Sequence, residues 1–291
     1  MNKIKSFIIA IYAFAGSMML TGCEHLVLIQ SKGEIGQDER DLIFTALFLM
    51  LLVVIPVIIM TVVFAYRYRA SNTKATYDPH FHHSNKIEVA IWGIPIIIVG
   101  ILGIIIWKTT HKLDPYRPLE HENKPVVVQV VALDWKWLFI YPDHNVATIN
   151  YLELPVNTPV QFKVTADAPM NSFMIPQLGG QIYAMAGMQT QLHLIASEEG
   201  IYDGRGYGFS GAGFNGMHFK AHVVSQDEFD NWVNQTKSSP ELTTDVYKQL
   251  VQPSEYVQPQ FFGSVSNNLF DDIMMKFMMP GMEDMSSMSS N

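Results

Sequence analysis

The sequence predicts a two-helix transmembrane hairpin, followed by an all-β sandwich or barrel and short C-terminal helices. Two long apolar runs, at residues 42–65 and 87–107, predict the hairpin. Short segments in which apolar and polar residues alternate predict a β domain of about 100 residues, at 125–225. Three segments with acidic first turns predict a helical segment at 226–279. Because 48% of the 291 residues are hydrophobic, part of the chain is expected to lie in lipid.

The N-terminus is typical of a lipoprotein signal peptide. Lys3 and Lys5 precede an apolar run that ends in "LTGC", where Cys23 is the only cysteine of the chain. This end resembles a bacterial lipobox, so residues 1–22 are expected to be removed and Cys23 to be lipidated at the head of an outer segment, 23–41. The alternative is an incidental cysteine in an apolar segment. A disulfide within the chain is excluded in either case.

The two apolar runs are each long enough to cross a bilayer. Residues 42–65 carry no charge, and residues 87–107 carry only Glu88. Pro56 and Pro95 are tolerable inside membrane helices, because neighbouring groups can satisfy the freed carbonyls. The cytoplasmic loop, 66–86, and the linker, 108–124, hold four basic residues each, so the positive-inside count is indecisive. The lipobox decides instead, and it places the β domain and both termini on the periplasmic side of a bacterial inner membrane.

Alternation identifies the strands of the β domain. Val160, Phe162 and Val164 alternate with Gln161 and Lys163, and similar patterns occur around 192–194 and 219–223. The sequence "GAGFNG" at 211–216 satisfies the G-x-G-x-x-G pattern, but it lies between two β segments and not between a strand and a helix. Dinucleotide binding is therefore rejected. A Met/Ser tail, 280–291, is expected to be disordered.

The charge balance disfavours a nucleic-acid role. The chain has 19 basic against 27 acidic residues, and removal of residues 1–22 would also remove two lysines. Phosphate binding needs clustered Lys and Arg.

Three stretches carry a family resemblance: "SNKIEVAIWGIP" (84–95), "LDWKWLFIYPD" (133–143) and "MNSFMIPQLGGQIYAMAGM" (170–188). With the lipobox and the hairpin, they resemble subunit II of the haem–copper terminal oxidases, and best the subunit II of cytochrome bo-type ubiquinol oxidases. The resemblance spans nearly the whole mature chain. It implies that the β domain is cupredoxin-like.

In the cytochrome c oxidase branch of this family, the cupredoxin holds a binuclear copper centre. Its ligand pattern, H-S-x-x-x-P and C-x-E-x-C-x-x-x-H-x-x-M, can be placed on this sequence. The ligand positions become Asn171, Gly206, Gly208, Ser210, Phe214 and Met217. Only the methionine survives, and soft copper sites need Cys and His. The resemblance therefore implies a vacated copper site and no metal or cofactor in this chain.

The resemblance also implies the complex in which the chain works. A copper centre accepts single electrons from cytochrome c, whereas quinol can deliver to a haem inside the membrane. Haem and copper are expected in a partner, subunit I, beside further small membrane subunits, with the lipid bilayer around them and quinol as the substrate of the complex. Trp135 stands where the copper branch receives electrons, but without copper we interpret Trp135 and Trp137 as core aromatics. The five glycines of "GYGFSGAGFNGM" (206–217) are interpreted as turn formers, because glycine readily adopts positive φ.

Glu88 is the one ionisable residue inside a predicted span. In the family, a Glu at this place lies at the mouth of a proton channel in subunit I. A carboxylate that reaches the lipid interface is the alternative interpretation.

Two further clusters could bind metal. His80, His82 and His83 form an "HFHH" stretch, but three imidazoles alone make an incomplete structural site, and polar loop residues are the favoured interpretation. The Met-rich end could bind Cu(I), which would make the chain an independent copper-handling or scaffolding envelope lipoprotein. We prefer the interpretation that Met274, Met275, Met278 and Met279 line one flank of a packed helix.

Overall fold

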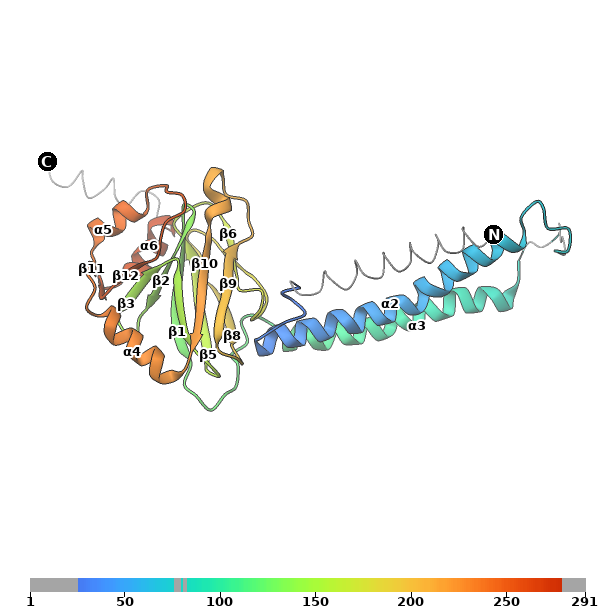
Figure 1. Cartoon of the computed structure of the whole chain (residues 1–291), viewed down its shortest axis with the longest axis horizontal. Coiled ribbons are helices and arrows are strands. Elements are labelled where there is room, and N and C mark those ends of the chain that lie inside the picture. Colours follow the sequence, from blue (N-terminus) through green and yellow to red (C-terminus); the bar gives the residue numbers. More distant parts are fainter. Residues whose placement is uncertain (1–25, 76–79, 81–82, 279–291) are drawn as a thin grey trace, which may run out of the picture. The chain divides into compact units, whose positions relative to one another are not determined.

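The computed structural model describes residues 26–75, 80 and 83–278. The chain divides into two compact units, a helical one at Asp38–Arg117 and a β unit formed by the residues before and after it. Figure 1 shows the helix pair, the β-sandwich and the short C-terminal helices. The fold class expected from the sequence is confirmed.

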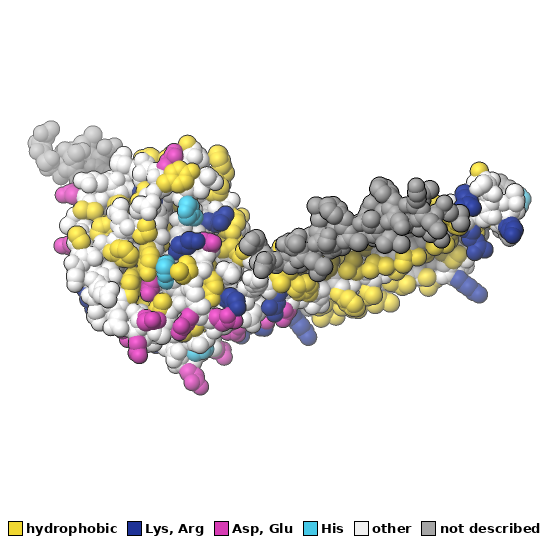
Figure 2. Space-filling model, viewed as in Figure 1, with side chains coloured by type: hydrophobic (Ala, Val, Ile, Leu, Met, Phe, Trp, Pro, Cys, Tyr) yellow, Lys and Arg dark blue, Asp and Glu magenta, His cyan; other side chains and the backbone are white. Residues whose placement is uncertain are grey.

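Two long helices form the helical unit. Helix α2 spans Glu34–Arg67 and helix α3 spans Asn85–Lys112. Both are long and apolar enough to cross a membrane, with mean hydropathies of 3.2 and 2.8 in their most apolar windows, and no residue of those windows is buried within the described chain. Figure 2 shows hydrophobic side chains along the visible side of both helices. Each helix contains a predicted span and continues beyond it with polar residues.

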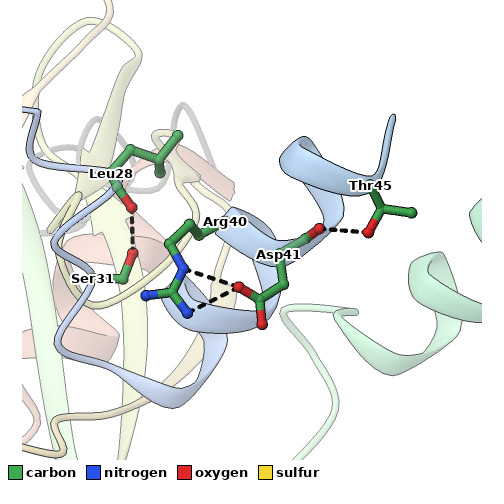
Figure 3. A network of polar contacts seen from close by, with 5 residues as sticks. All are labelled: Leu28, Ser31, Arg40, Asp41 and Thr45. Atoms are coloured by element: carbon green, nitrogen blue, oxygen red, sulfur yellow. Dashed lines mark hydrogen bonds and ion pairs between the residues drawn. The ribbon is translucent and has the colours of Figure 1, made fainter. Parts of the chain in front are cut away.

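Polar contacts near the start of α2 involve mostly residues close in sequence. Arg40 pairs with Asp41 at 2.9 Å, and the Thr45 hydroxyl donates to the Asp41 carbonyl at 2.8 Å (Figure 3). Just before the helix, Ser31 donates to the Leu28 carbonyl at 2.7 Å. Such back-bonding satisfies a hydroxyl within its own segment.

The β unit is a sandwich of two sheets. One has the strand order β12-β3-β2-β1-β5-β8 and the other β4-β10-β9-β6-β7, while β11 and β13 form a separate pair. Pairs β1–β5 and β4–β10 are parallel. The strands are β1 (Val126–Leu133), β2 (Lys136–Tyr141), β3 (Val146–Ile149), β4 (Tyr151–Pro155), β5 (Pro159–Ala166), β6 (Asn171–Met174), β7 (Ile182–Ala184), β8 (Thr190–Ile195), β9 (Gly200–Gly206), β10 (His218–Val224), β11 (Glu241–Leu242), β12 (Gln260–Phe262) and β13 (Ser264–Val265).

An aromatic core fills the space between the two sheets. Trp137 and Phe139 from the first sheet contact Phe173 and Phe219 from the second, and all four side chains are fully buried or nearly so. The Phe173 and Phe219 rings are stacked at 5.5 Å. Each large aromatic side chain buries about 150–250 Å², so these four supply a large share of the apolar area in this core.

The outer face of the first sheet is covered by the C-terminal segment. Helices α4 (Gln226–Thr236), α5 (Thr244–Leu250) and α6 (Leu269–Met278) occupy the three segments predicted to be helical. Side chains from α5, α6 and their flanks bury Leu138 and Ile140 of β2 and pack in a second hydrophobic cluster. The first sheet is therefore apolar on both faces.

Two contacts attach α5 and α6 to the end of β5. The carboxylate of Asp167 accepts a hydrogen bond from the Tyr247 hydroxyl and forms an ion pair with Lys276, both at 2.8 Å. The Asp167 side chain is 2% exposed. The methionine flank predicted for α6 is only partly correct. Met274 packs against the second cluster, but Met275 and Met278 are 47% and 57% exposed.

The segment before α2 is joined to the β unit as an extra edge. The amides of Lys32 and Gly33 donate to the Gln177 carbonyl, and the Ser197 amide donates to the Lys32 carbonyl. A Cβ at Gly33 would lie 2.9 Å from the Ile195 carbonyl oxygen, so only glycine permits this approach. No pattern in the sequence predicts this pairing.

A carboxyl group is buried under α4. Glu153 on β4 is 5% exposed and accepts a hydrogen bond from the Tyr151 hydroxyl at 2.6 Å. Burial raises the pKa of Glu153, the Tyr151 bond lowers that pKa by less, and the charge of Glu228 raises it further. The Tyr151 ring also stacks on His222, whose pKa is lowered by burial and by Lys220.

We expect Glu153→Gln to alter how stability depends on pH. Because the pKa of Glu153 is higher in the folded chain than its unfolded value of about 4.3, the protonated carboxyl stabilises the fold at low pH, and this contribution is lost as the pH rises through the folded pKa. The glutamine carries no charge, so the variant should lack this loss. Unfolding of the detergent-solubilised chain in urea, measured from pH 4 to 8, gives the difference between the two proteins. The exposed Glu241→Gln serves as the control, and a Glu153→Gln curve parallel to wild type would contradict the expectation.

Candidate functional site

The candidate site is the 206–217 loop, which joins β9 to β10. Its "GAGFNG" stretch forms a single 3-10 turn, η2 (Ala212–Gly216), after Gly211 at φ 109°. A strand follows directly, so no α-helix N-terminus is present at this loop to receive a pyrophosphate. The rejection of dinucleotide binding is consistent with this geometry.

Five of the six predicted copper-ligand positions meet around one amide. Asn171, the first residue of β6, is 1% exposed. Its Nδ2 donates to Ser210 Oγ at 3.1 Å and to Met217 Sδ at 3.2 Å. Its Oδ1 accepts from the Gly208 amide at 3.2 Å, and the Gly206 amide donates to the Met217 carbonyl at 3.2 Å. We call these residues the Asn171 cluster: Asn171, Gly206, Gly208, Ser210 and Met217.

The sixth position, Phe214, contributes to this loop in a different way. Its carbonyl accepts from the Met217 amide at 3.0 Å. Its ring lies against the ring of Phe209, with centroids 5.7 Å apart, and Phe209 is 81% exposed. Phe214 therefore supports the loop backbone and an aromatic pair.

The donor set of the cluster does not fit a binuclear copper centre. It offers one amide, one hydroxyl and one thioether. The amide group already has four hydrogen-bond partners, because the Ser172 amide also donates to Asn171 Oδ1. Soft copper sites are built from thiolate and imidazole, and a thioether alone is a weak ligand. Among the described residues, no three His, Cys, Asp or Glu side chains come together as a metal site.

Most of the loop glycines make room for neighbouring side chains. The turn-forming interpretation is correct for Gly211, the one of the five described loop glycines with positive φ. A Cβ at Gly206 would lie 2.5 Å from Asn171 Oδ1, and one at Gly216 would lie 3.0 Å from Tyr256 Cδ1. A Cβ at Gly213 would clash with the Trp135 ring.

The two tryptophans of "LDWKW" have different environments. Trp137 is a core residue at 0% exposure, as expected. Trp135 is only partly buried and has φ 63°, an unfavourable conformation for a bulky residue. Its indole donates to the Ser210 carbonyl at 3.0 Å, so the ring covers the outer side of the loop.

Between the two tryptophans, Lys136 is buried and binds the chain segment that follows α5. It is 1% exposed, and its ammonium donates to the Gln252 carbonyl at 2.8 Å and to Ser254 Oγ at 2.6 Å. Burial lowers the pKa of Lys136, and Asp134 partly opposes this. These bonds hold residues 252–254 beside the Trp135 turn.

Glu88 lies in the first turn of α3, where its Oε1 is 3.2 Å from His83 Nδ1. Both side chains are exposed within the chain. The "HFHH" stretch was interpreted as three imidazoles alone, but the structure places a carboxylate beside one of them, His83. His82, Cys23 and the 280–291 tail lie outside the described residues.

Comparison with known proteins identifies the class of the domain. The family "Cytochrome C oxidase subunit II, periplasmic domain" matches residues 143–225, and the "COX Aromatic Rich Motif" matches residues 237–281. The periplasmic domain of subunit II of cytochrome oxidase of Bradyrhizobium japonicum is 21% identical, with a TM-score of 0.39 over 42% of this chain and 98% of that one. The fold and the matched residues together define a cupredoxin-like domain of the oxidase subunit II class.

Sequence relatives narrow the class to one family. "Cytochrome bo(3) ubiquinol oxidase subunit 2" of Pseudomonas aeruginosa is 55% identical over 91% of this chain and 80% of the relative. "Ubiquinol oxidase subunit 2" of Acetobacter aceti is 50% identical over 95% of this chain and 90% of the relative. The chain belongs to the ubiquinol oxidase subunit 2 family. It is therefore a subunit of a quinol oxidase complex, and two candidate membrane helices with a periplasmic domain fit an inner-membrane protein.

We expect Gly213→Ala to destabilise the loop. Its new methyl would meet the Trp135 ring and lie 2.7 Å from Glu255 Cγ, and such overpacking costs about 1–3 kcal/mol. Gly208→Ala is the matched control in the same loop, because its Cβ would approach no closer than 3.3 Å, to Asn171 Cα. Urea unfolding of the full chain compares the two. Equal stabilities would show that the Trp135 contact is not tight.

Proposed function

We propose that this chain is a non-catalytic subunit of a proton-pumping ubiquinol oxidase and carries no electron-transfer metal of its own. The complex oxidises quinol to quinone and reduces O₂ to water. The haem and copper centres belong to the partner subunit I. The observation that carries the proposal is the donor set of the Asn171 cluster, in which an amide, a hydroxyl, a thioether and glycine backbone stand at the copper-ligand positions.

The identity of the reductant follows from that donor set. A soluble one-electron donor needs a metal relay at the surface of the oxidase, whereas quinol is lipid-soluble and reaches a haem within the membrane. A domain without thiolate or imidazole at this loop supplies no such relay. The relatives named as ubiquinol oxidase subunits support the same reductant.

The contributions of this chain are then assembly and, at Glu88, proton uptake. Helices α2 and α3 present apolar side chains that are unburied within the chain, so subunit I, further small subunits and lipid can cover them. Glu88 stands at the loop end of α3, which we place on the cytoplasmic side. Lipidation of Cys23 anchors the other end of the chain to the periplasmic leaflet.

The copper content of the chain tests the main proposal. We expect the detergent-purified subunit, separated from subunit I, to bind less than a tenth of an equivalent of copper after incubation with the ion and gel filtration, since a complete soft-ligand set is missing. Metal analysis gives the ratio, and the optical spectrum gives the kind of site. A stoichiometric copper with thiolate or mixed-valence absorption would overturn the proposal.

A substitution at Glu88 tests proton uptake. We expect Glu88→Gln to slow quinol oxidation by the purified complex several-fold, because an amide cannot exchange the proton that a carboxyl group carries. Assembly should be intact, as judged by the haem that co-purifies with the subunit. The exposed linker substitution Glu120→Gln provides the control. Turnover of Glu88→Gln at the control level would remove the proton-uptake role and leave the rest of the proposal standing.

A further inference from the structure

The amide of Asn171 uses all of its hydrogen-bonding capacity. An asparagine side chain has two N–H donors and a carbonyl oxygen with two lone pairs. Here the donors bind Ser210 Oγ and Met217 Sδ, and the oxygen accepts from the amides of Ser172 (2.7 Å) and Gly208. A buried polar group with every partner satisfied holds its surroundings in one geometry.

These bonds connect segments that are distant in the sequence. Asn171 begins β6, and three of its four partners, Gly208, Ser210 and Met217, lie 37 to 46 residues further along the chain. One further donor reinforces the same connection, because the Tyr207 amide donates to both the backbone carbonyl and the side-chain hydroxyl of Ser172, each at 3.3 Å. The cluster therefore fastens the beginning and the end of the loop to the same strand.

The glycine at 206 provides independent support for this role. Gly206 does not have positive φ, so its backbone conformation is open to other residues. Only the space that the Asn171 side chain takes up excludes a Cβ, which would lie 2.5 Å from Oδ1. Glycine at 206 is thus matched to the amide at 171.

We propose that Asn171 is a positioning residue that orders the 206–217 loop without metal, in place of the copper that fixes this loop in the cytochrome c oxidase branch. A metal joins its ligand segments through several strong bonds from one centre. The Asn171 amide makes a comparable connection, because one buried group forms one bond to its own strand and three bonds to separate parts of the loop. The inference rests on the proposal that the loop binds no copper.

Hydrogen–deuterium exchange of the full chain in detergent tests the inference. We expect Asn171→Ala to raise exchange in peptides covering 206–217 by about tenfold or more, because several buried bonds are lost together. Asn215→Ala is the control in the same loop, where the amide is exposed and only faces Tyr256 Oη at 3.4 Å. A change of less than about twofold in Asn171→Ala, relative to that control, would overturn the inference.

A double substitution separates the role of the amide from general damage. Gly206→Ala alone should raise exchange in the loop, because its methyl collides with the Asn171 side chain. In the Asn171→Ala background the same methyl has room, so it should add less than about twofold. Effects that simply multiply would contradict the matching of Gly206 to Asn171.

Two further experiments test the positioning role if Asn171→Ala does not fold or if the chain binds copper. If Asn171→Ala does not fold, Ser210→Ala and Met217→Leu each remove one hydrogen-bond acceptor of the Asn171 amide. Each substitution should raise exchange in the loop by roughly two- to fivefold. Unchanged exchange in both variants would reject the positioning role of Asn171.

Copper chelation of the wild-type chain should leave loop exchange unchanged. Bound copper whose removal loosens the loop would defeat the proposed function itself, whereas a copper-free chain that is insensitive to Asn171→Ala would defeat only the inference.

Discussion

The central constraint on this structure is that the sheet containing β1 and β2 must be covered on both faces. Val131 and Leu138 face one hydrophobic cluster, while Trp137 and Phe139 face the other. A sheet with apolar side chains on both faces cannot remain open to water, because burial of that surface is the main favourable term in folding. One face is closed by the second sheet and the other by the C-terminal segment. The segment matched by the aromatic-rich motif is thus a necessary layer of the β unit.

That covering layer also positions the outer side of the 206–217 loop. On its path between α5 and β12, the chain passes beside the Trp135–Lys136 turn, where Lys136 binds Gln252 and Ser254. Trp135 is held between this passage and the glycines of the loop. A bulky residue at positive φ persists only when its surroundings determine its conformation. The loop is therefore enclosed from outside by the C-terminal layer and from inside by the Asn171 amide.

The sequence predicted those features that arise from local periodicity. Alternation around Val160–Val164 marked β5 correctly, and acidic first turns marked α4, α5 and α6. Strands β1 and β2 lack a clear alternation because both of their faces are buried, which removes the period-two signal. Strands β11 and β13 are two residues long, too short for any periodic pattern.

The site was predictable as a set of positions but not as a geometry. The resemblance brought Asn171, Ser210 and Met217 together as ligand counterparts, and the structure places them in contact. No local pattern indicates that an asparagine will bond to atoms 37 to 46 residues away, because such bonds depend on the packed sheets. The glycines were similarly ambiguous, since a sequence does not distinguish a glycine needed for φ from one needed for space. Gly211 is of the first kind and Gly206 of the second.

An amide and a metal can order the same loop, but their chemical consequences differ. A metal centre binds only deprotonated ligands, couples folding to metal supply and can carry an electron. An amide does none of these, because it has no charge, does not titrate near neutral pH and has no accessible redox state. A loop ordered by Asn171, as proposed above, would keep its shape at any copper concentration and would supply no redox centre. In the quinol oxidase complex proposed above, whose reductant arrives through the membrane, such a domain would contribute a rigid surface and leave the electron path to its partner.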